Sequence, residues 1–174
     1  MKRLLDIFLT TAILLFLGLI VAKLQNGYAE PISGAARVID GDTLSIGDTR
    51  IRLSGLDAPE IAQTCLRDDV SWECGRDAKE RLRAMIGERE VVCMPRGGDR
   101  YGRMLATCVA GERALNAGMV EDGYAIADGA YEAEERRART AGRAIWAGTF
   151  DPPRQWREWN LPAADEEFYD RVDP

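Results

Sequence analysis

Between residues 35 and 109, short runs of alternating apolar and polar residues predict β-strands. The expected strands are 37–39, 43–46, 50–53, 90–94 and 103–109. Asp-Gly and Gly-Asp pairs separate the first three runs, and such pairs are typical of the tight turns of β-hairpins. We therefore expect a three-stranded meander and, after an intervening segment, a two-stranded hairpin.

Apolar residues at helical spacing predict helices in three places. The expected helices are 76–86, 114–121 and 131–147. In the first of these, Ala78, Leu82 and Met85 recur on one face, and Gly87 ends the pattern. Five strands with a helix between the third and the fourth is the order of an OB-type barrel. The sequence thus predicts an α+β fold that is mainly a five-stranded OB-fold barrel with about three helices.

Residues 1–29 read as a targeting segment, because Lys2 and Arg3 precede a long apolar run. The small residues Gly27 and Ala29 favour a cleaved signal peptide, whereas the apolar run is also long enough for a retained membrane anchor. Either alternative exports the rest of the chain, which would be periplasmic, secreted or anchored in an inner membrane.

The exported part is expected to divide into a barrel domain, residues 30–150, and an acidic tail, residues 151–174, that is disordered over 165–174. The whole chain has a formal charge of -6, and residues 1–29 carry three positive charges and one negative, so the exported part carries -8. A protein this acidic does not hold a polyanion by general attraction. Binding of nucleic acid would therefore depend on local arginines and a bound cation.

Four cysteines lie in the part that is expected to be exported, and an even number in an oxidising compartment predicts disulfides. Of the three possible pairings we favour Cys93 with Cys108, on facing arms of the expected hairpin, and Cys65 with Cys74, which closes a short loop. A zinc site is the alternative. Its usual ligand spacings are missing, and the chain has no histidine.

The absence of histidine also removes the commonest general base, so any chemistry must use carboxylates, arginines or a hard cation. Asp42 and Asp57 lie at the edges of expected strands, and two carboxylates in one cleft repel each other unless a cation lies between them. With a backbone carbonyl near Ala58 and several waters, they would suit Ca²⁺. The alternative is that both are ordinary turn residues.

Three further residues complete a candidate site. Arg52 alternates with two apolar neighbours, so its guanidinium faces away from the core and suits a phosphate, or otherwise a surface salt bridge. Glu60 follows a proline that stiffens its approach, and its carboxylate could take a proton from a water. Arg103 follows Tyr101-Gly102, where a close turn would swing a second guanidinium towards the first; otherwise the segment is simply a hairpin turn.

The order of these motifs resembles the thermonuclease family, whose best-known member is staphylococcal nuclease. The resemblance covers residues 35–150 and rests on Val38–Thr43, Arg50–Glu60 and Asp99–Arg103, with Leu115-Asn116 and Ile145-Trp146 further on. It implies an OB-fold, calcium-dependent phosphodiesterase that cleaves DNA and RNA to leave 3′-phosphates.

The resemblance also implies roles for individual residues. Asp42 and Asp57 match the side-chain calcium ligands, Ala58 matches a position that contributes its carbonyl, Asp40 a supporting acidic residue, and Glu60 the general base.

On the substrate side, Arg52 and Arg103 match the phosphate-binding pair, and Arg100 and Tyr101 match nucleotide contacts. The segment Tyr124–Tyr131 lacks the family's tyrosine-rich loop, so Tyr131 would substitute only in part.

The sequence therefore predicts an exported, monomeric endonuclease that uses Ca²⁺ and acts on nucleic acid, single-stranded DNA or RNA in particular. A retained N-terminal segment would add contact with a membrane. Two alternatives stay open, a binding module for nucleic acid or another polyanion that does not cut, and a phosphodiesterase that acts on a cell-envelope polymer.

Overall fold

The computed structural model describes residues 2–25 and 30–160, which fall into two units, one within residues 1–30 and one within 31–174. The first unit consists of helix α1 (Lys2–Gln25). In the described part of the chain, no helix combines the length and the apolar character needed to cross a membrane. The expected cleavage region around Gly27 and Ala29, and the tail segment 165–174, lie outside the described residues.

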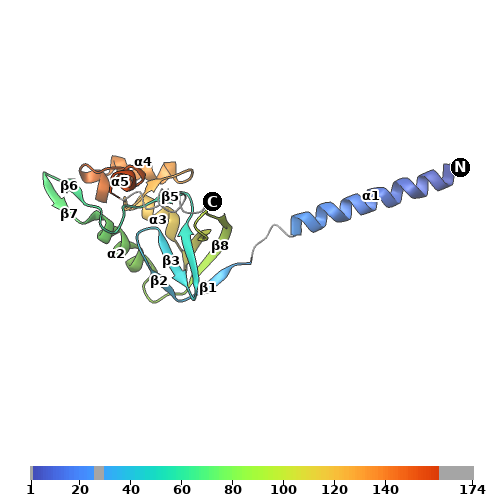
Figure 1. Ribbon diagram of the computed structural model, residues 1–174, viewed down its shortest axis with the longest axis horizontal. Coiled ribbons are helices and arrows are strands. Elements are labelled where there is room, and N and C mark those ends of the chain that lie inside the picture. Colours follow the sequence, from blue (N-terminus) through green and yellow to red (C-terminus); the bar gives the residue numbers. More distant parts are fainter. Residues whose placement is uncertain (1, 26–29, 161–174) are drawn as a thin grey trace, which may run out of the picture. The chain divides into compact units, whose positions relative to one another are not determined.

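The second unit is built on a seven-stranded sheet, shown in Figure 1, whose strand order is β1-β8-β9-β4-β3-β2, with β10 paired to β9. The strands are β1 (Ile32–Gly34), β2 (Ala36–Val38), β3 (Thr43–Ile46), β4 (Thr49–Leu53), β8 (Val91–Gly98), β9 (Met104–Ala110) and β10 (Arg113–Ala114). All neighbours are antiparallel except β4 and β9, which are parallel. The five expected strands and the OB-type α+β fold are confirmed.

Alternating burial along β4 shows which face of the sheet packs on the core. Ile51 and Leu53 are fully buried, and Arg52 between them points to the other side. The inner face is covered by α2 (Cys74–Ile86), which buries Ala78, Leu82 and Met85, and by α3 (Leu115–Glu121). The predicted helical face of α2 is therefore the one that packs on the sheet.

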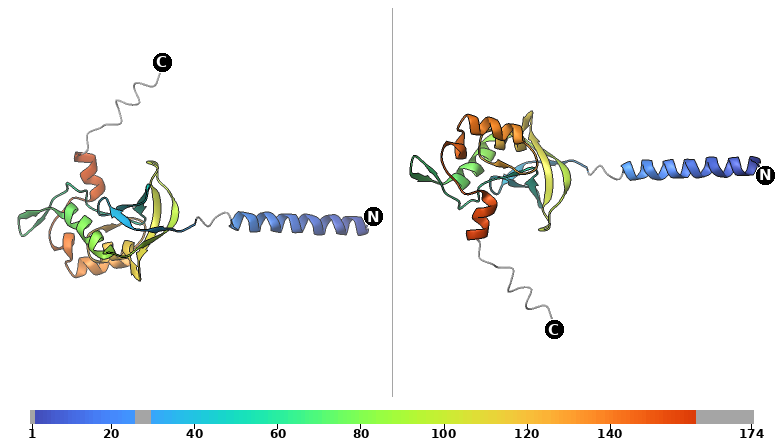
Figure 2. Two further views of the ribbon diagram at one scale, coloured as in Figure 1. Left: turned by 90° about the horizontal axis from the view of Figure 1, so that it is seen from below. Right: turned by 90° about the horizontal axis from the view of Figure 1, so that it is seen from above.

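The structure corrects the predicted helix 131–147, which consists of two elements. Helix α4 (Glu132–Thr140) ends before Gly142, whose φ of +59° a continuous helix cannot accommodate, and a short 3₁₀ helix, η1 (Ala144–Ala147), follows. A further helix, α5 (Pro153–Asn160), lies in what the sequence suggested was tail. Figure 2 shows α5 (red) and α4 (orange) on opposite sides of the domain.

Short strands also occupy segments where no element was expected. The polar stretch after Ala62 contains a hairpin of β6 (Cys65–Arg67) and β7 (Val70–Trp72), and β5 (Leu56–Asp57) pairs with β11 (Ile126–Ala127). The hairpin turns through Asp68 and Asp69, both with positive φ. Figures 1 and 2 show this hairpin and the β8–β9 hairpin at opposite ends of the domain.

Both favoured disulfides are present. Cys93 faces Cys108 across β8 and β9, as the hairpin predicts, and their sulfur atoms are 2.04 Å apart. Cys65 and Cys74 form the second bond, with Cα atoms 5.7 Å apart, and so tie β6 to the first turn of α2. The four cysteines are therefore structural, and the zinc alternative is wrong.

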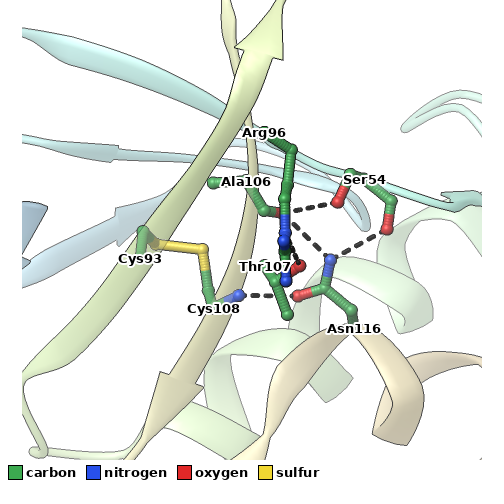
Figure 3. Close-up of a disulfide and its surroundings, with 7 residues drawn as sticks. All are labelled: Ser54, Cys93, Arg96, Ala106, Thr107, Cys108 and Asn116. Atoms are coloured by element: carbon green, nitrogen blue, oxygen red, sulfur yellow. Dashed lines mark hydrogen bonds between the residues drawn. A yellow bond between two sulfur atoms is a disulfide. The ribbon is translucent and has the colours of Figure 1, made fainter. Parts of the chain in front are cut away.

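Asn116 holds the turn that follows β4 against β9, next to the Cys93–Cys108 disulfide, as Figure 3 shows. Its side-chain oxygen accepts the Cys108 N–H at 2.9 Å, and its amide donates to the carbonyls of Ser54 and Ala106 at 2.9 and 3.0 Å. The side chain is buried and satisfies three backbone groups at once.

We expect Asn116→Ala to lower the free energy of unfolding by about 2–4 kcal/mol, because the Cys108 N–H and the Ser54 carbonyl lose their side-chain partner. Urea unfolding monitored by circular dichroism measures the loss. The exposed Asn160→Ala is the control and should cost less than about 0.5 kcal/mol. Equal stabilities of the two variants would contradict a structural role for Asn116.

Candidate active site

Arg52 joins the two carboxylates that the sequence singled out. Its Nη1 donates to Asp42 Oδ1 and its Nη2 donates to Asp57 Oδ1, each at 2.7 Å. Asp42 immediately precedes β3, Arg52 lies on β4 and Asp57 ends β5, so the three side chains come from consecutive short elements of the chain. The two aspartate side chains are only 6% and 5% exposed, which places both negative charges in a largely desolvated cluster around one guanidinium.

Local structure fixes Asp42 in this position. The carboxylate of Asp40 accepts the Asp42 N–H at 3.0 Å, which shapes the turn. A Cβ atom on Gly41 would lie 2.8 Å from the Cβ atoms of Ala58 and Ala78, so only glycine fits between the turn and α2. Asp40 therefore shapes the backbone at Asp42, and its supporting role in the site stays a prediction.

Burial of Asp42 disfavours the charged form of its carboxyl group. Desolvation raises the pKa of Asp42 to about 7, although the Arg52 guanidinium opposes the shift. Its carboxylate also accepts the Thr43 hydroxyl at 2.9 Å and the Ala58 N–H at 3.2 Å. A carboxylate in this environment needs a cation beside it in order to be charged at neutral pH.

Glu60 lies next to this cluster and is held by a residue that sequence reasoning missed. Gln63, which is fully buried, accepts the Glu60 N–H through its side-chain oxygen at 3.2 Å and donates its own N–H to the Glu60 carbonyl at 2.7 Å. A Cβ atom on Gly75, in the first turn of α2, would clash with the same carbonyl oxygen. The backbone of Glu60 is thus fixed, while its side chain is 31% exposed and accessible to water.

Arg157 of α5 is the second residue that the sequence did not reveal. Its Nη1 donates to Asp57 Oδ1 at 3.1 Å and to Glu60 Oε1 at 2.7 Å, and its Nη2 donates to Asp57 Oδ2 at 2.9 Å. Although desolvation opposes the shift, these hydrogen bonds raise the pKa of Arg157. The local signal available was Pro153, since proline favours the first position of a helix.

Arg103 belongs to a separate turn between β8 and β9. Asp99 organises the turn, because its carboxylate accepts the N–H groups of Tyr101 and Arg103, each at 2.9 Å, and the Arg103 Nε at 2.7 Å. The exposed Tyr101 ring has the guanidinium carbon of Arg100 4.9 Å from its centre and that of Arg103 at 5.5 Å. The loop thus presents two cations and one aromatic ring to solvent.

The segment Tyr124–Tyr131, which lacks the family's tyrosine-rich loop, lies beside Asp57. Ile126 of β11 is the register partner of Asp57, so the segment borders the acidic cluster. Tyr131 is partly buried against the hydrophobic core, and its ring packs at Gly55, where a Cβ atom would approach it to 3.0 Å. Tyr131 is therefore largely committed to packing, and a role in substrate binding stays a prediction.

The donors around Arg52 suit a hard cation. Within residues 2–25 and 30–160, no group of three or more histidine, cysteine, aspartate and glutamate side chains is arranged to hold a metal ion. The predicted calcium set needs only the carboxylates of Asp42 and Asp57, with the carbonyl of Ala58 and waters as further oxygen ligands. That two buried carboxylates already share one cation, the guanidinium, supports this fit.

Comparison with known proteins gives the family. The family described as "Staphylococcal nuclease homologue" matches residues 50–148, which include Arg52, Asp57, Glu60 and Arg103. This chain is a staphylococcal nuclease homologue. The earlier resemblance is thereby confirmed, and the family is one of nucleases.

Of three relatives of this staphylococcal nuclease homologue, two are named as endonucleases. It is 37% identical to the "Succinoglycan biosynthesis protein ExoI" of Rhizobium meliloti over 128 residues, and this match covers 69% of this chain and 67% of the relative. It is 28% identical over 164 residues to an "Uncharacterized endonuclease" of Haemophilus influenzae, covering 87% and 84%, and 31% identical over 133 residues to another from Escherichia coli O157:H7, covering 70% and 81%.

Proposed function

We propose that this protein is an exported, calcium-dependent endonuclease that hydrolyses phosphodiester bonds in DNA or RNA and leaves 3′-phosphates. The observation that carries the proposal is the buried Asp42–Arg52–Asp57 cluster with the half-exposed Glu60 at its edge. Carboxylates for a hard cation, a guanidinium for a phosphate and a carboxylate for water are the parts that such a hydrolysis needs.

In the mechanism that we propose, Glu60 accepts a proton from the attacking water. A bound Ca²⁺, held by Asp42, Asp57 and the Ala58 carbonyl, would polarise the phosphodiester. Arg52 and Arg103 donate to phosphate oxygens and offset the charge that develops during in-line attack. A guanidinium has too high a pKa to donate its proton readily, so a water protonates the leaving 5′-oxygen.

The substrate reaches the site over the loop at Arg100 and Tyr101. An exposed ring flanked by guanidinium groups suits an unpaired base and its phosphate, which favours single-stranded nucleic acid. The two disulfides support an oxidising compartment and therefore export, with the segment 1–29 as its signal. We propose that the protein acts as a monomer in the periplasm or outside the cell.

We expect cleavage of single-stranded DNA to require Ca²⁺ and to fall at least 100-fold, about the effect of losing one electrostatic catalyst, when the ion is chelated. Release of acid-soluble nucleotides with calcium, with chelator and after calcium is restored measures this. Full activity in chelator would refute the metal role. Saturable DNA binding without any cleavage in calcium would instead favour the binding-module alternative.

A second candidate is a phosphodiesterase that acts on a cell-envelope polymer. The name of the Rhizobium meliloti relative places that protein in the biosynthesis of succinoglycan, and this observation keeps the alternative open. Assays of the same preparation on single-stranded DNA and on a phosphodiester-linked envelope polymer, such as a teichoic acid, separate the two. Faster turnover of the envelope polymer would favour the second candidate.

A further inference from the structure

Helix α5 brings an additional cation into the acidic cluster. Arg157 contacts both oxygens of Asp57 and one oxygen of Glu60, at distances between 2.7 and 3.1 Å. Its side chain is 28% exposed, so the ion pairs are partly shielded from solvent and salt. The C-terminal helix thus contacts one proposed calcium ligand and the proposed base through a single guanidinium.

The Arg157 guanidinium and a divalent cation would bind the same oxygen atoms of Asp57. Asp57 Oδ1 accepts from both Arg52 and Arg157, and Asp57 Oδ2 accepts from Arg157. A calcium ligand must approach the ion to about 2.3–2.6 Å, closer than any of these hydrogen bonds. Both oxygens of Asp57 are thus occupied by guanidinium groups, and a calcium ion beside Asp57 would also lie close to the positive charge of Arg157. Ion binding at Asp57 is therefore favoured when Arg157 withdraws.

The attachment of α5 is compatible with such withdrawal. The chain enters α5 at a fixed point, because Gln63 donates to the Asp151 carbonyl at 2.7 Å and Pro153 is buried. Beyond that point Trp156 and Arg157 are half-buried, and the remaining residues of the helix are exposed. The helix is therefore anchored at its start, and the contacts of Arg157 are made from its lightly packed part.

We propose that Arg157 is a positioning residue of the active site that competes with Ca²⁺ for Asp57 and restrains Glu60 until the ion binds. The inference rests on the proposed function, in which Asp57 is a calcium ligand. Calcium binding then displaces Arg157, which frees the Glu60 carboxylate and leaves a guanidinium at the edge of the site. Helix α5 sets the calcium concentration at which the enzyme becomes active.

The test compares Arg157→Gln with Arg154→Gln in the full chain. Both changes remove one positive charge from α5, but Arg154 is exposed. Isothermal titration with Ca²⁺ alone should give a dissociation constant about tenfold lower for Arg157→Gln than for Arg154→Gln or the wild type. In chelator, the melting temperature of Arg157→Gln should fall by about 3 °C, because Asp57 and Glu60 lose a partner.

Calcium affinity and stability without calcium thus move in opposite directions, which a general loss of structure does not produce. Arg157→Lys keeps the charge but cannot bridge both carboxylates, so its dissociation constant for Ca²⁺ should lie between those of Arg157→Gln and the wild type. Arg157→Lys also replaces Arg157→Gln in the test if the latter fails to fold. If Arg157→Gln binds calcium as weakly as the wild type or more weakly, Arg157 does not compete with the ion, although the proposed calcium dependence of the enzyme still stands. If none of the chains binds calcium, the proposed calcium function fails, and the competition fails with it.

Discussion

Glu60→Gln is expected to lower kcat for single-stranded DNA by about 10²–10⁴, the usual contribution of a general base. The amide has nearly the shape of the carboxylate but cannot accept a proton from water. Gln63 binds the backbone of residue 60, so the substituted side chain should stay in place. Initial rates in saturating calcium, across a range of substrate concentrations, separate kcat from KM.

The control for this change is Glu88→Gln, which removes the same charge from an exposed position after α2. It should keep the wild-type rate. If Glu60→Gln retained more than about a tenth of the wild-type kcat, Glu60 would not be the base. The proton would then have to go to another carboxylate of the cluster.

Arg52→Lys is expected to lower kcat/KM by about 10²–10³. The ammonium keeps the positive charge, but it cannot donate to Asp42 and Asp57 in the fork geometry that the guanidinium uses at 2.7 Å to each. It also offers a phosphate one point of contact in place of two. Steady-state kinetics with short single-stranded oligonucleotides measures the loss.

Arg50→Lys is a matched control, because Arg50 lies on the same strand, two residues earlier, and is exposed. Its kinetics should be those of the wild type. Melting curves show whether Arg52→Lys is folded at the assay temperature. A folded Arg52→Lys with wild-type kcat/KM would remove Arg52 from the proposed mechanism and leave it a structural ion pair.

The sequence predicted best where one physical rule dominates. Alternation of buried and exposed residues located the five strands and the outward direction of Arg52, and the facing arms of a hairpin gave the Cys93–Cys108 pair. The predicted helix 131–147 was wrong in its length, because the periodicity of apolar residues continues across Gly142 although the backbone does not.

The residues that were missed are those whose role depends on distant segments. Arg157 reaches Asp57 across 100 residues of sequence, and Gln63 reaches Asp151 across 88. Neither position has a pattern around it that points to the site, since arginines interspersed with carboxylates, or a single glutamine in a polar segment, are typical of a surface. Such contacts depend on the tertiary fold and not on local propensity.

The Cys65–Cys74 bond links the geometry of the candidate site to the redox state of the chain. It tethers the first turn of α2, and Gly75 in that turn abuts the backbone of Glu60. On the proposed route of export, a newly made chain in a reducing cytosol would lack this tether, and the proposed base Glu60 would be held less firmly while the genome of the cell is within reach. Formation of the disulfide after the proposed export would then complete the proposed active site only where the DNA of the producing cell is out of reach.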